Sequence, residues 1–286
     1  MQLALKIEVG SYRGTREGVP QLLEVLTRHA AKASFFFALG HDRSGRAIFG
    51  KNPRVGRFEH YGLKTLLYGT LLPSPHIGSS CRDILLRVRD AGFEVGCLEN
   101  MDWREHVATQ SAAWTRREMQ LTVAQFTEVF GEAPKAHAAS GWQLNRDALR
   151  LTQHLGFEYA SDTRGGCPFI PTWAAETIKF PQLPTTLPTL DELIGRDGIT
   201  VDNVAERLLE MTRNAPANGH VFTLRAELEG RKWLPVFEQL LAGWKAQGYE
   251  LVALRQYLQD LQDTLPRHGV RMGELNGRKG KLAIQV

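Results

Sequence analysis

The stretch Ala91-Gly-Phe-Glu-Val-Gly96 joins an amphipathic segment to a short apolar run through a single glycine. Gln247-Gly-Tyr-Glu-Leu-Val252 repeats this arrangement near the other end of the chain. A glycine directly after a helix favours the left-handed residue that ends it, and the apolar run that follows is typical of a strand. Both junctions therefore predict the helix-to-strand units of an α/β protein.

Outward from these junctions, short apolar runs alternate with amphipathic stretches, a pattern typical of strand–helix units around a parallel sheet. Helices are predicted at 17–30, 81–91, 115–130, 146–155, 201–212 and 234–247. Seven strands are predicted, at Leu3–Val9, Ala33–Leu39, Glu94–Cys97, Ala136–Ala139, Glu158–Ser161, His220–Leu224 and Glu250–Leu254. We therefore expect one domain over 1–286, an incomplete seven-stranded (β/α) barrel with its functional groups at the C-terminal ends of the strands.

The composition, 43% hydrophobic and 23% charged, is that of an ordinary globular protein. A formal net charge of +4 is compatible with an anionic small molecule as partner, and we expect no nucleic-acid partner. The N-terminus lacks the pattern of a secretion signal, and no apolar run approaches the ~20 residues of a spanning helix. Cys81, Cys97 and Cys167 form no CxxC pair, which favours free thiols in a reducing compartment. We expect a cytoplasmic protein, peripheral on the inner membrane.

The segment at about 41–78 interrupts the strand–helix alternation. It combines basic side chains with aromatic and aliphatic ones: Arg43, Arg46, Phe49, Lys51, Arg54, Arg57, Phe58, Tyr61, Lys64, Leu66, Leu67, Tyr68, Leu71 and Leu72. Such a mixture suits docking on an anionic bilayer surface. A surface loop whose apolar residues pack beneath it is the alternative interpretation, and the sequence leaves both open.

Several stretches resemble the polysaccharide deacetylase (NodB-homology) family. They include 5–20, Ala33-Ser-Phe-Phe-Phe37, Tyr159-Ala-Ser-Asp-Thr-Arg-Gly165 and Gly219–Gly230. The resemblance extends over about 3–260. Within the family the chain is similar in particular to the deformylases of undecaprenyl-phosphate-linked formamido-arabinose, and Pro181–Gly195 is the most specific part of this resemblance. It implies a barrel fold and hydrolysis of a formamide or acetamide on a lipid-linked amino-sugar.

Members of this family use a divalent metal, zinc, cobalt or manganese, held by one Asp and two His, with a further Asp as base and a His as acid. The metal lowers the pKa of a bound water, and the base and the acid move its proton to the leaving amine. The resemblance places Glu8 at the base, Arg225 at the acid, and Gly10, Leu98 and Asp102 at the metal ligands. Leucine carries no donor atom and arginine stays protonated, so we expect no metal cofactor and a degenerate site.

One rescue of a metal site is left open by the sequence. Asp102 and His106 are spaced i, i+4 and could share an ion on a helical turn, with Glu8 or Cys97 as third ligand and Glu99 nearby. Under that interpretation the chain is an active hydrolase with rearranged ligands. Solvated loop residues are the alternative.

Substrate-binding roles are predicted for Arg13, Trp142, Asp162, Arg164 and Arg225. A tryptophan can stack on a sugar, and arginines attract phosphate or carboxylate, while a buried tryptophan and a loop-closing ion pair are the structural alternatives. Two functions follow. In one, the barrel binds a lipid-linked amino-sugar or a partner enzyme without catalysis; in the other, it hydrolyses the amide bond.

Overall fold

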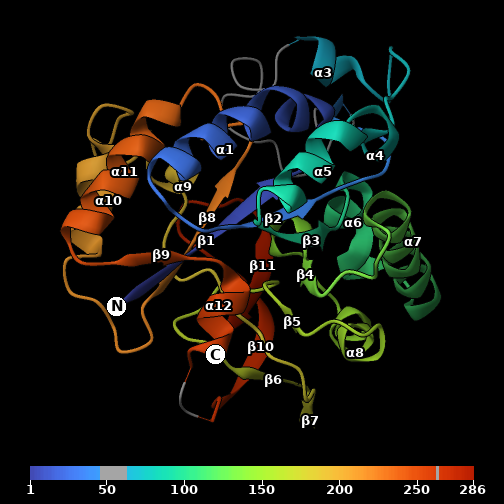
Figure 1. Cartoon of the computed structure of the whole chain (residues 1–286). Coiled ribbons are helices and arrows are strands. Elements are labelled where there is room, and N and C mark those ends of the chain that lie inside the picture. Colours follow the sequence, from blue (N-terminus) through green and yellow to red (C-terminus); the bar gives the residue numbers. More distant parts are fainter. Residues whose placement is uncertain (46–62, 262–263) are drawn as a thin grey trace.

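The computed structural model describes residues 1–45, 63–261 and 264–286 (Figure 1). Positions 46–62, which contain most of the basic and aromatic residues of the predicted insertion, lie outside the described residues. No helix in the described ranges has both the length and the apolar character needed to cross a bilayer.

The main sheet of the described chain contains the seven strands that the sequence predicts. They are β1 (Gln2–Val9), β2 (Ser34–Phe37), β3 (Glu94–Leu98), β4 (Ala136–Ala138), β5 (Tyr159–Ala160), β8 (His220–Arg225) and β9 (Glu250–Val252). Their order is β5-β4-β3-β2-β1-β8, with β9 also paired to β1, and every pairing is parallel. The sheet curls without closing, because β5 and β8 end the order without pairing to each other. The prediction of an incomplete α/β barrel is confirmed.

Strand β1 shows why the sheet has two different faces. Successive side chains of a strand point to opposite faces. Leu3, Leu5, Ile7 and Val9 belong to the larger apolar core between sheet and helices, whereas Ala4 packs with the smaller core on the concave face. Because side chains alternate along the strand, Lys6 and Glu8 lie on the same concave face as Ala4.

The helices cover the outer face of the sheet, and α11, α1 and α5 follow one another along it (Figure 1). The longer ones agree with the predicted segments: α1 (Val19–Arg28), α5 (Arg82–Asp90), α7 (Ala112–Phe130), α8 (Arg146–His154), α10 (Val204–Met211) and α11 (Leu234–Ala246). Shorter ones are α3 (Leu63–Leu67), α4 (Ile77–Ser80), α6 (Met101–His106), α9 (Leu190–Leu193) and α12 (Leu254–Gln259). Helix α7 is capped at both ends by residues that favour helix termini. The Ser111 side chain accepts from the Trp114 N–H at its start, and Gly131, at φ 78°, ends it.

An extended segment, 182–187, occupies the gap between β5 and β8. The Leu183 N–H donates to the Ala160 carbonyl on one side, at 2.8 Å, and the Thr186 N–H donates to the Val221 carbonyl on the other, at 3.0 Å. This segment belongs to the stretch with the most specific resemblance, and it leads directly into α9 at the C-terminal ends of the strands.

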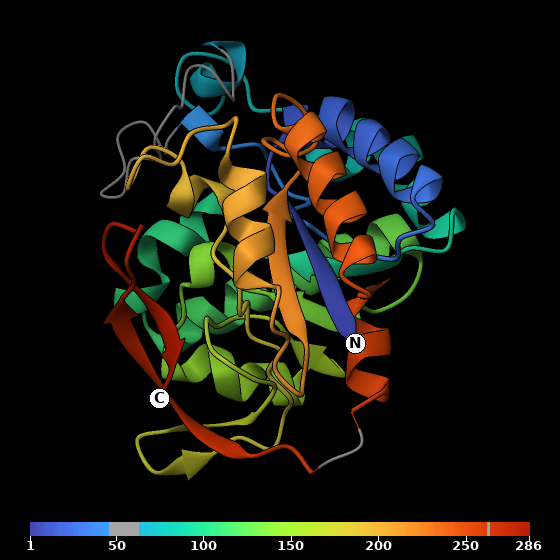
Figure 2. The same ribbon diagram turned by 90° about the vertical axis from the view of Figure 1, so that its left-hand side faces the viewer.

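A second sheet lies beside the first, in the order β11-β10-β6-β7 (Figure 2). Its strands are β6 (Ile170–Trp173), β7 (Glu176–Thr177), β10 (Arg267–Glu274) and β11 (Lys281–Gln285). The C-terminal stretch of the chain forms a strand hairpin, in which β10 and β11 pair antiparallel. The turn of this hairpin brings Arg278 to α9.

Candidate functional site

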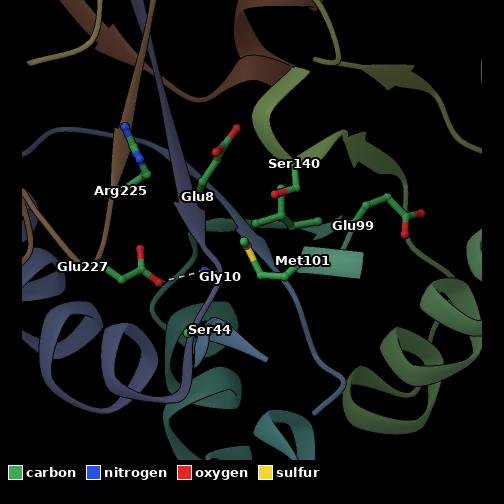
Figure 3. A pocket seen from close by; sticks show the side chains of 9 residues that line it. Glu8, Gly10, Ser44, Glu99, Met101, Ser140, Arg225 and Glu227 are labelled. Atoms are coloured by element: carbon green, nitrogen blue, oxygen red, sulfur yellow. Dashed lines mark hydrogen bonds between the residues drawn. The ribbon is translucent and has the colours of Figure 1, made fainter. Parts of the chain in front are cut away.

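The predicted catalytic positions meet at the C-terminal end of the sheet. Glu8 ends the concave face of β1 and is the register partner of Arg225 at the end of β8. A cavity of about 20 Å³ lies between them (Figure 3), with room for about one water molecule. Its lining consists of Glu8, Gly10, Ser44, Leu98, Glu99, Met101, Ser140, Arg225 and Glu227.

Glu8 has a cationic neighbour that the sequence analysis missed. The Lys6 ammonium lies 3.1 Å from Glu8 Oε1 and donates to the Ser161 carbonyl at 2.6 Å. The Lys6 side chain is fully buried, and its ammonium also lies 5.8 Å from the Trp142 ring centroid. A buried ammonium needs a carboxylate partner, so the negative charge of Glu8 balances the positive charge of Lys6. The signal was present in the sequence, because i and i+2 share one face of a strand.

Arg225 is held by two carboxyl groups. Its guanidinium forms an ion pair with Asp191 of α9, and its backbone N–H donates to Glu229 Oε2 at 2.8 Å. Burial would raise the pKa of Asp191, but the guanidinium groups of Arg225 and Arg278 hold it well below its usual value. Burial raises the pKa of Glu229 to about 7, against the opposing effect of the Arg225 N–H.

Gly10 leaves space next to the cavity. The Glu227 carboxylate accepts from the Gly10 N–H at 2.9 Å and from the Ser11 hydroxyl at 2.7 Å (Figure 3). A Cβ built at Gly10 would meet only Glu227 Oε1, at 3.9 Å, which is ordinary van der Waals contact. A Cβ therefore fits at this position without moving the backbone.

The proposed rescue ligands do not converge on Glu8. Leu98 packs on the concave face with the smaller core, while Cys97, its neighbour along β3, packs in the larger core on the opposite face. Asp102 forms an ion pair with Arg43, and the His106 Nδ1 lies 2.8 Å from the Asp102 carbonyl oxygen. Within the described residues there is no group of three His, Cys, Asp or Glu side chains able to hold a metal ion.

Glu99 instead belongs to a buried cluster on the helix side of the sheet. The His137 ring lies 2.8 Å from Asp162 Oδ1 and 3.3 Å from Glu99 Oε1. Burial lowers the pKa of His137, but Asp162 and Glu99 outweigh it and raise the pKa to about 10. Asp162 also accepts from the Ala139 N–H at 2.8 Å. The Glu99 side chain points away from Glu8 (Figure 3), and Asp162, a predicted substrate-binding residue, lies in a fully buried structural network.

Trp142 and Arg164, also predicted to bind substrate, pack against the C-terminal hairpin. The guanidinium carbons of Arg164 and Arg278 lie 4.9 and 4.5 Å from the Trp142 ring centroid. Arg164 donates to Glu192 at 2.6 Å and to the Leu187 carbonyl at 2.9 Å. Neither Trp142, which is 1% exposed, nor Arg164 lines the cavity.

Arg13 lies outside the cavity as well. It pairs with Glu17 at 3.0 Å and lines a separate pocket next to α3. Of the five predicted substrate-binding residues, the cavity therefore brings only Arg225 to Glu8.

Comparison with known proteins assigns the family. The chain is 33% identical to the "Probable 4-deoxy-4-formamido-L-arabinose-phosphoundecaprenol deformylase ArnD" of Shewanella sediminis, over 100% of this chain and 95% of that protein. It belongs to the polysaccharide deacetylase family. The protein of the same name from Wigglesworthia glossinidia brevipalpis is 28% identical, over 95% of this chain and 98% of that one. No family model matches the chain.

Solved structures show the same fold. The Mycobacterium smegmatis polysaccharide deacetylase structure matches 95% of each chain with a TM-score of 0.63 at 16% identity. A CE4 family pseudoenzyme from Bacillus anthracis matches with a TM-score of 0.55 at 15% identity, over 94% of this chain and 69% of that one. Both carry the polysaccharide deacetylase barrel, in agreement with the curled parallel sheet described above.

Proposed function

We propose that this member of the polysaccharide deacetylase family binds a lipid-linked amino-sugar without hydrolysing its amide bond. The substrate class comes from the relatives, which are named as deformylases of an arabinose-phosphoundecaprenol. The loss of hydrolysis comes from the residues at the strand ends. We place the protein peripherally on a membrane surface, where such a lipid is accessible.

The observation that carries the proposal is the Lys6–Glu8 ion pair. Family chemistry needs a divalent cation beside the base, to polarise the carbonyl and lower the pKa of water. Here an ammonium lies 3.1 Å from Glu8 and the Arg225 guanidinium ends the neighbouring strand. Both repel a divalent ion, and Leu98 offers it no donor atom. The residues present do not fit the family's metal.

The charged and polar groups of the cavity favour a strongly polar ligand. The carboxylates of Glu8, Glu99 and Glu227 and the guanidinium of Arg225 line it, so hydroxyl and amide groups of a sugar find both acceptors and donors there. A sugar ring is several times larger than one water molecule, so binding requires lining side chains such as Met101 to move. We expect the ligand to be held by hydrogen bonds, without an activated water.

An active hydrolase with rearranged ligands remains the second candidate, and Glu229 favours it. A buried carboxyl with a pKa of about 7 can exchange a proton near neutral pH, as a general acid or base must. Glu229 contacts the backbone of Arg225, a residue that lines the cavity, and Glu8, Glu99 and Glu227 supply three carboxylates to the cavity itself.

Metal content separates the two functions. The protein is soaked with zinc, cobalt or manganese, desalted and analysed, beside a variant carrying Gly10→Asp, Leu98→His, Asp102→His and Arg225→His. Position 10 accepts a Cβ without a clash, and the Asp102–Arg43 pair is partly exposed, so these two of the four changes should not disturb the fold. We expect no stoichiometric metal in the natural chain and about one ion in the variant.

The matched control is the same variant with Leu98 retained, which lacks one ligand and should lose the ion. A mutant of the Bacillus anthracis pseudoenzyme is described as having restored activity, which supports the design. One ion held by the natural chain, together with release of formate from a formamido-sugar lipid, would refute the proposal and establish the hydrolase.

A further inference from the structure

A second pocket opens on the surface beside the Glu8 cavity, with a volume of about 530 Å³. It is lined by Tyr12, Arg13, Arg16, Glu17, Lys64, Thr65 and Tyr68, and we call it the α3 pocket. One wall comes from the helical residues 12–17 that follow β1, and the other comes from α3 and the residue after it. Figure 1 shows α3 at the edge of the molecule, beyond α1.

The α3 pocket has an excess of positive charge. Three of its lining side chains are cationic and one is acidic. The acidic one, Glu17, is shared between Arg13 and Arg231, each at 3.0 Å, so its charge is more than balanced. Arg16 points its guanidinium over the Tyr12 ring and donates to the Tyr12 hydroxyl at 2.6 Å. A pocket with these groups recognises a phosphate.

The walls of the α3 pocket are fixed by contacts behind them. The Tyr12 and Tyr68 rings meet edge to face with centroids 6.3 Å apart. The Tyr12 N–H donates to the buried Asp42 carboxylate at 2.8 Å, and the Tyr68 carbonyl accepts from the Gly45 N–H at 3.2 Å. The two cationic walls are therefore held together before any ligand arrives, which lowers the cost of binding.

The α3 pocket and the Glu8 cavity flank the same turn of the chain. Glu8 and Tyr12 are four residues apart, a span of at most about 14 Å. Ser44 lines the cavity and donates its N–H to the same Asp42 carboxylate that holds Tyr12. A single ligand can therefore place a sugar near Glu8 and a phosphate in the α3 pocket.

Next to this pocket the chain exposes an apolar side chain. Leu71, which follows α3, is 81% exposed, the highest exposure among the large apolar residues described. It lies three residues from Tyr68, in the segment for which the sequence leaves membrane docking and a packed surface loop open. An exposed leucine beside cations suits the boundary between lipid headgroups and acyl chains.

From these contacts we infer that the α3 pocket binds the phosphate group of a membrane lipid, through Arg13, Arg16 and Lys64, while Leu71 contacts the acyl region. The inference rests on the proposed function, since it supplies the phosphate subsite of the lipid-linked sugar. It concerns residues outside the Glu8 cavity, so it can fail independently of the loss of hydrolysis.

The test measures binding of the full chain to vesicles of phosphatidylcholine containing one-fifth phosphatidic acid, and separately to soluble glucose 1-phosphate. Arg16→Gln and Lys64→Gln should each weaken vesicle binding about fivefold, as expected for one basic residue at an anionic surface. Leu71→Gln should weaken vesicle binding and leave glucose 1-phosphate binding unchanged. Arg116→Gln, on exposed α7, is the matched control and should change neither.

Three outcomes decide the inference. Loss with Arg16→Gln and Lys64→Gln but not with Arg116→Gln supports a phosphate site in the α3 pocket. Binding of glucose 1-phosphate without any vesicle binding overturns the membrane source. Equal loss in all three charge variants overturns the pocket, because it means that vesicles respond only to the net charge of +4.

Discussion

Two buried ionic clusters lie on opposite faces of the sheet. The inner cluster, on the concave side, consists of Lys6, Glu8, Arg164, Asp191, Glu192, Arg225 and Arg278 around Trp142. The outer cluster, on the helix side, consists of Glu99, His137 and Asp162. The inner cluster holds four cations against three carboxylates, with the carboxyl groups of Glu227 and Glu229 beside it, whereas the outer one holds one imidazolium against two carboxylates.

The difference shows where this chain places positive charge. The cations of the inner cluster lie at the strand ends, at the edge of a cavity that three carboxylates line, where relatives that hydrolyse amides need a metal ion. The outer cluster is completely buried, and its Glu99 carboxylate pairs with His137, so its charges serve the fold. The inner cluster therefore combines two tasks, holding the C-terminal hairpin and setting the charge of the cavity.

The outer cluster should give the largest pH effect. The folded pKa of His137, about 10, lies above the ordinary histidine value of 6.5, so its stabilisation is complete below pH 6.5 and is lost as pH rises through 10. A shift of this size corresponds to up to about 5 kcal/mol. Urea unfolding between pH 6 and pH 10 should show this decline.

The His137→Gln variant provides the reference for that experiment, because it keeps a donor towards Asp162 but cannot titrate. Its stability should be lower than that of the natural chain at pH 6 and should approach it at pH 10. Parallel curves for the two proteins would mean that His137 is neutral in the fold and that the outer cluster has a different charge.

The inner cluster should respond to the loss of one cation. Arg164→Met removes the donor to Glu192 and to the Thr185 and Leu187 carbonyls, so it should lower the free energy of unfolding by about 3–5 kcal/mol. The exposed arginine of the Arg146–Glu176 pair is the control, and Arg146→Gln should cost less than about 1 kcal/mol. Similar small losses of unfolding free energy at both sites would show that Arg278 alone is sufficient to pair with the Glu192 carboxylate.

Much of the main sheet could be predicted from the sequence because its strands are local apolar runs with helices between them. The second sheet could not. Strand β6 contains Pro171, β7 has two residues, and β6 pairs with β10 across about a hundred residues of chain, in the register Ile170 with Arg267. Neither period-two alternation nor a turn signal predicts a pairing between strands so far apart in the sequence.

The candidate site was partly visible in the sequence. Glu8 and Arg225 were located by family resemblance, and the structure makes them neighbours. Lys6 was missed although strand periodicity already placed it beside Glu8. Thr189 and Glu192 carry the signature of a capping box, but the pairing of Glu192 with Arg164 and Arg278 depends on the tertiary fold. The pairing of Asp191 with Arg225 depends on it as well.

Glu229 offers the smallest of the three tests, and it concerns the cavity side of the comparison. Its pKa rises from 4.5 to about 7, so the stabilising effect of the protonated form is complete below pH 4.5 and is lost as pH rises through 7. Glu229→Gln keeps an oxygen that accepts from the Arg225 N–H while it removes the buried charge. It should therefore raise the free energy of unfolding by up to about 3 kcal/mol at pH 8, and by almost nothing at pH 4. A loss at pH 8 would mean instead that the Glu229 carboxylate is needed in its charged form to balance Arg225.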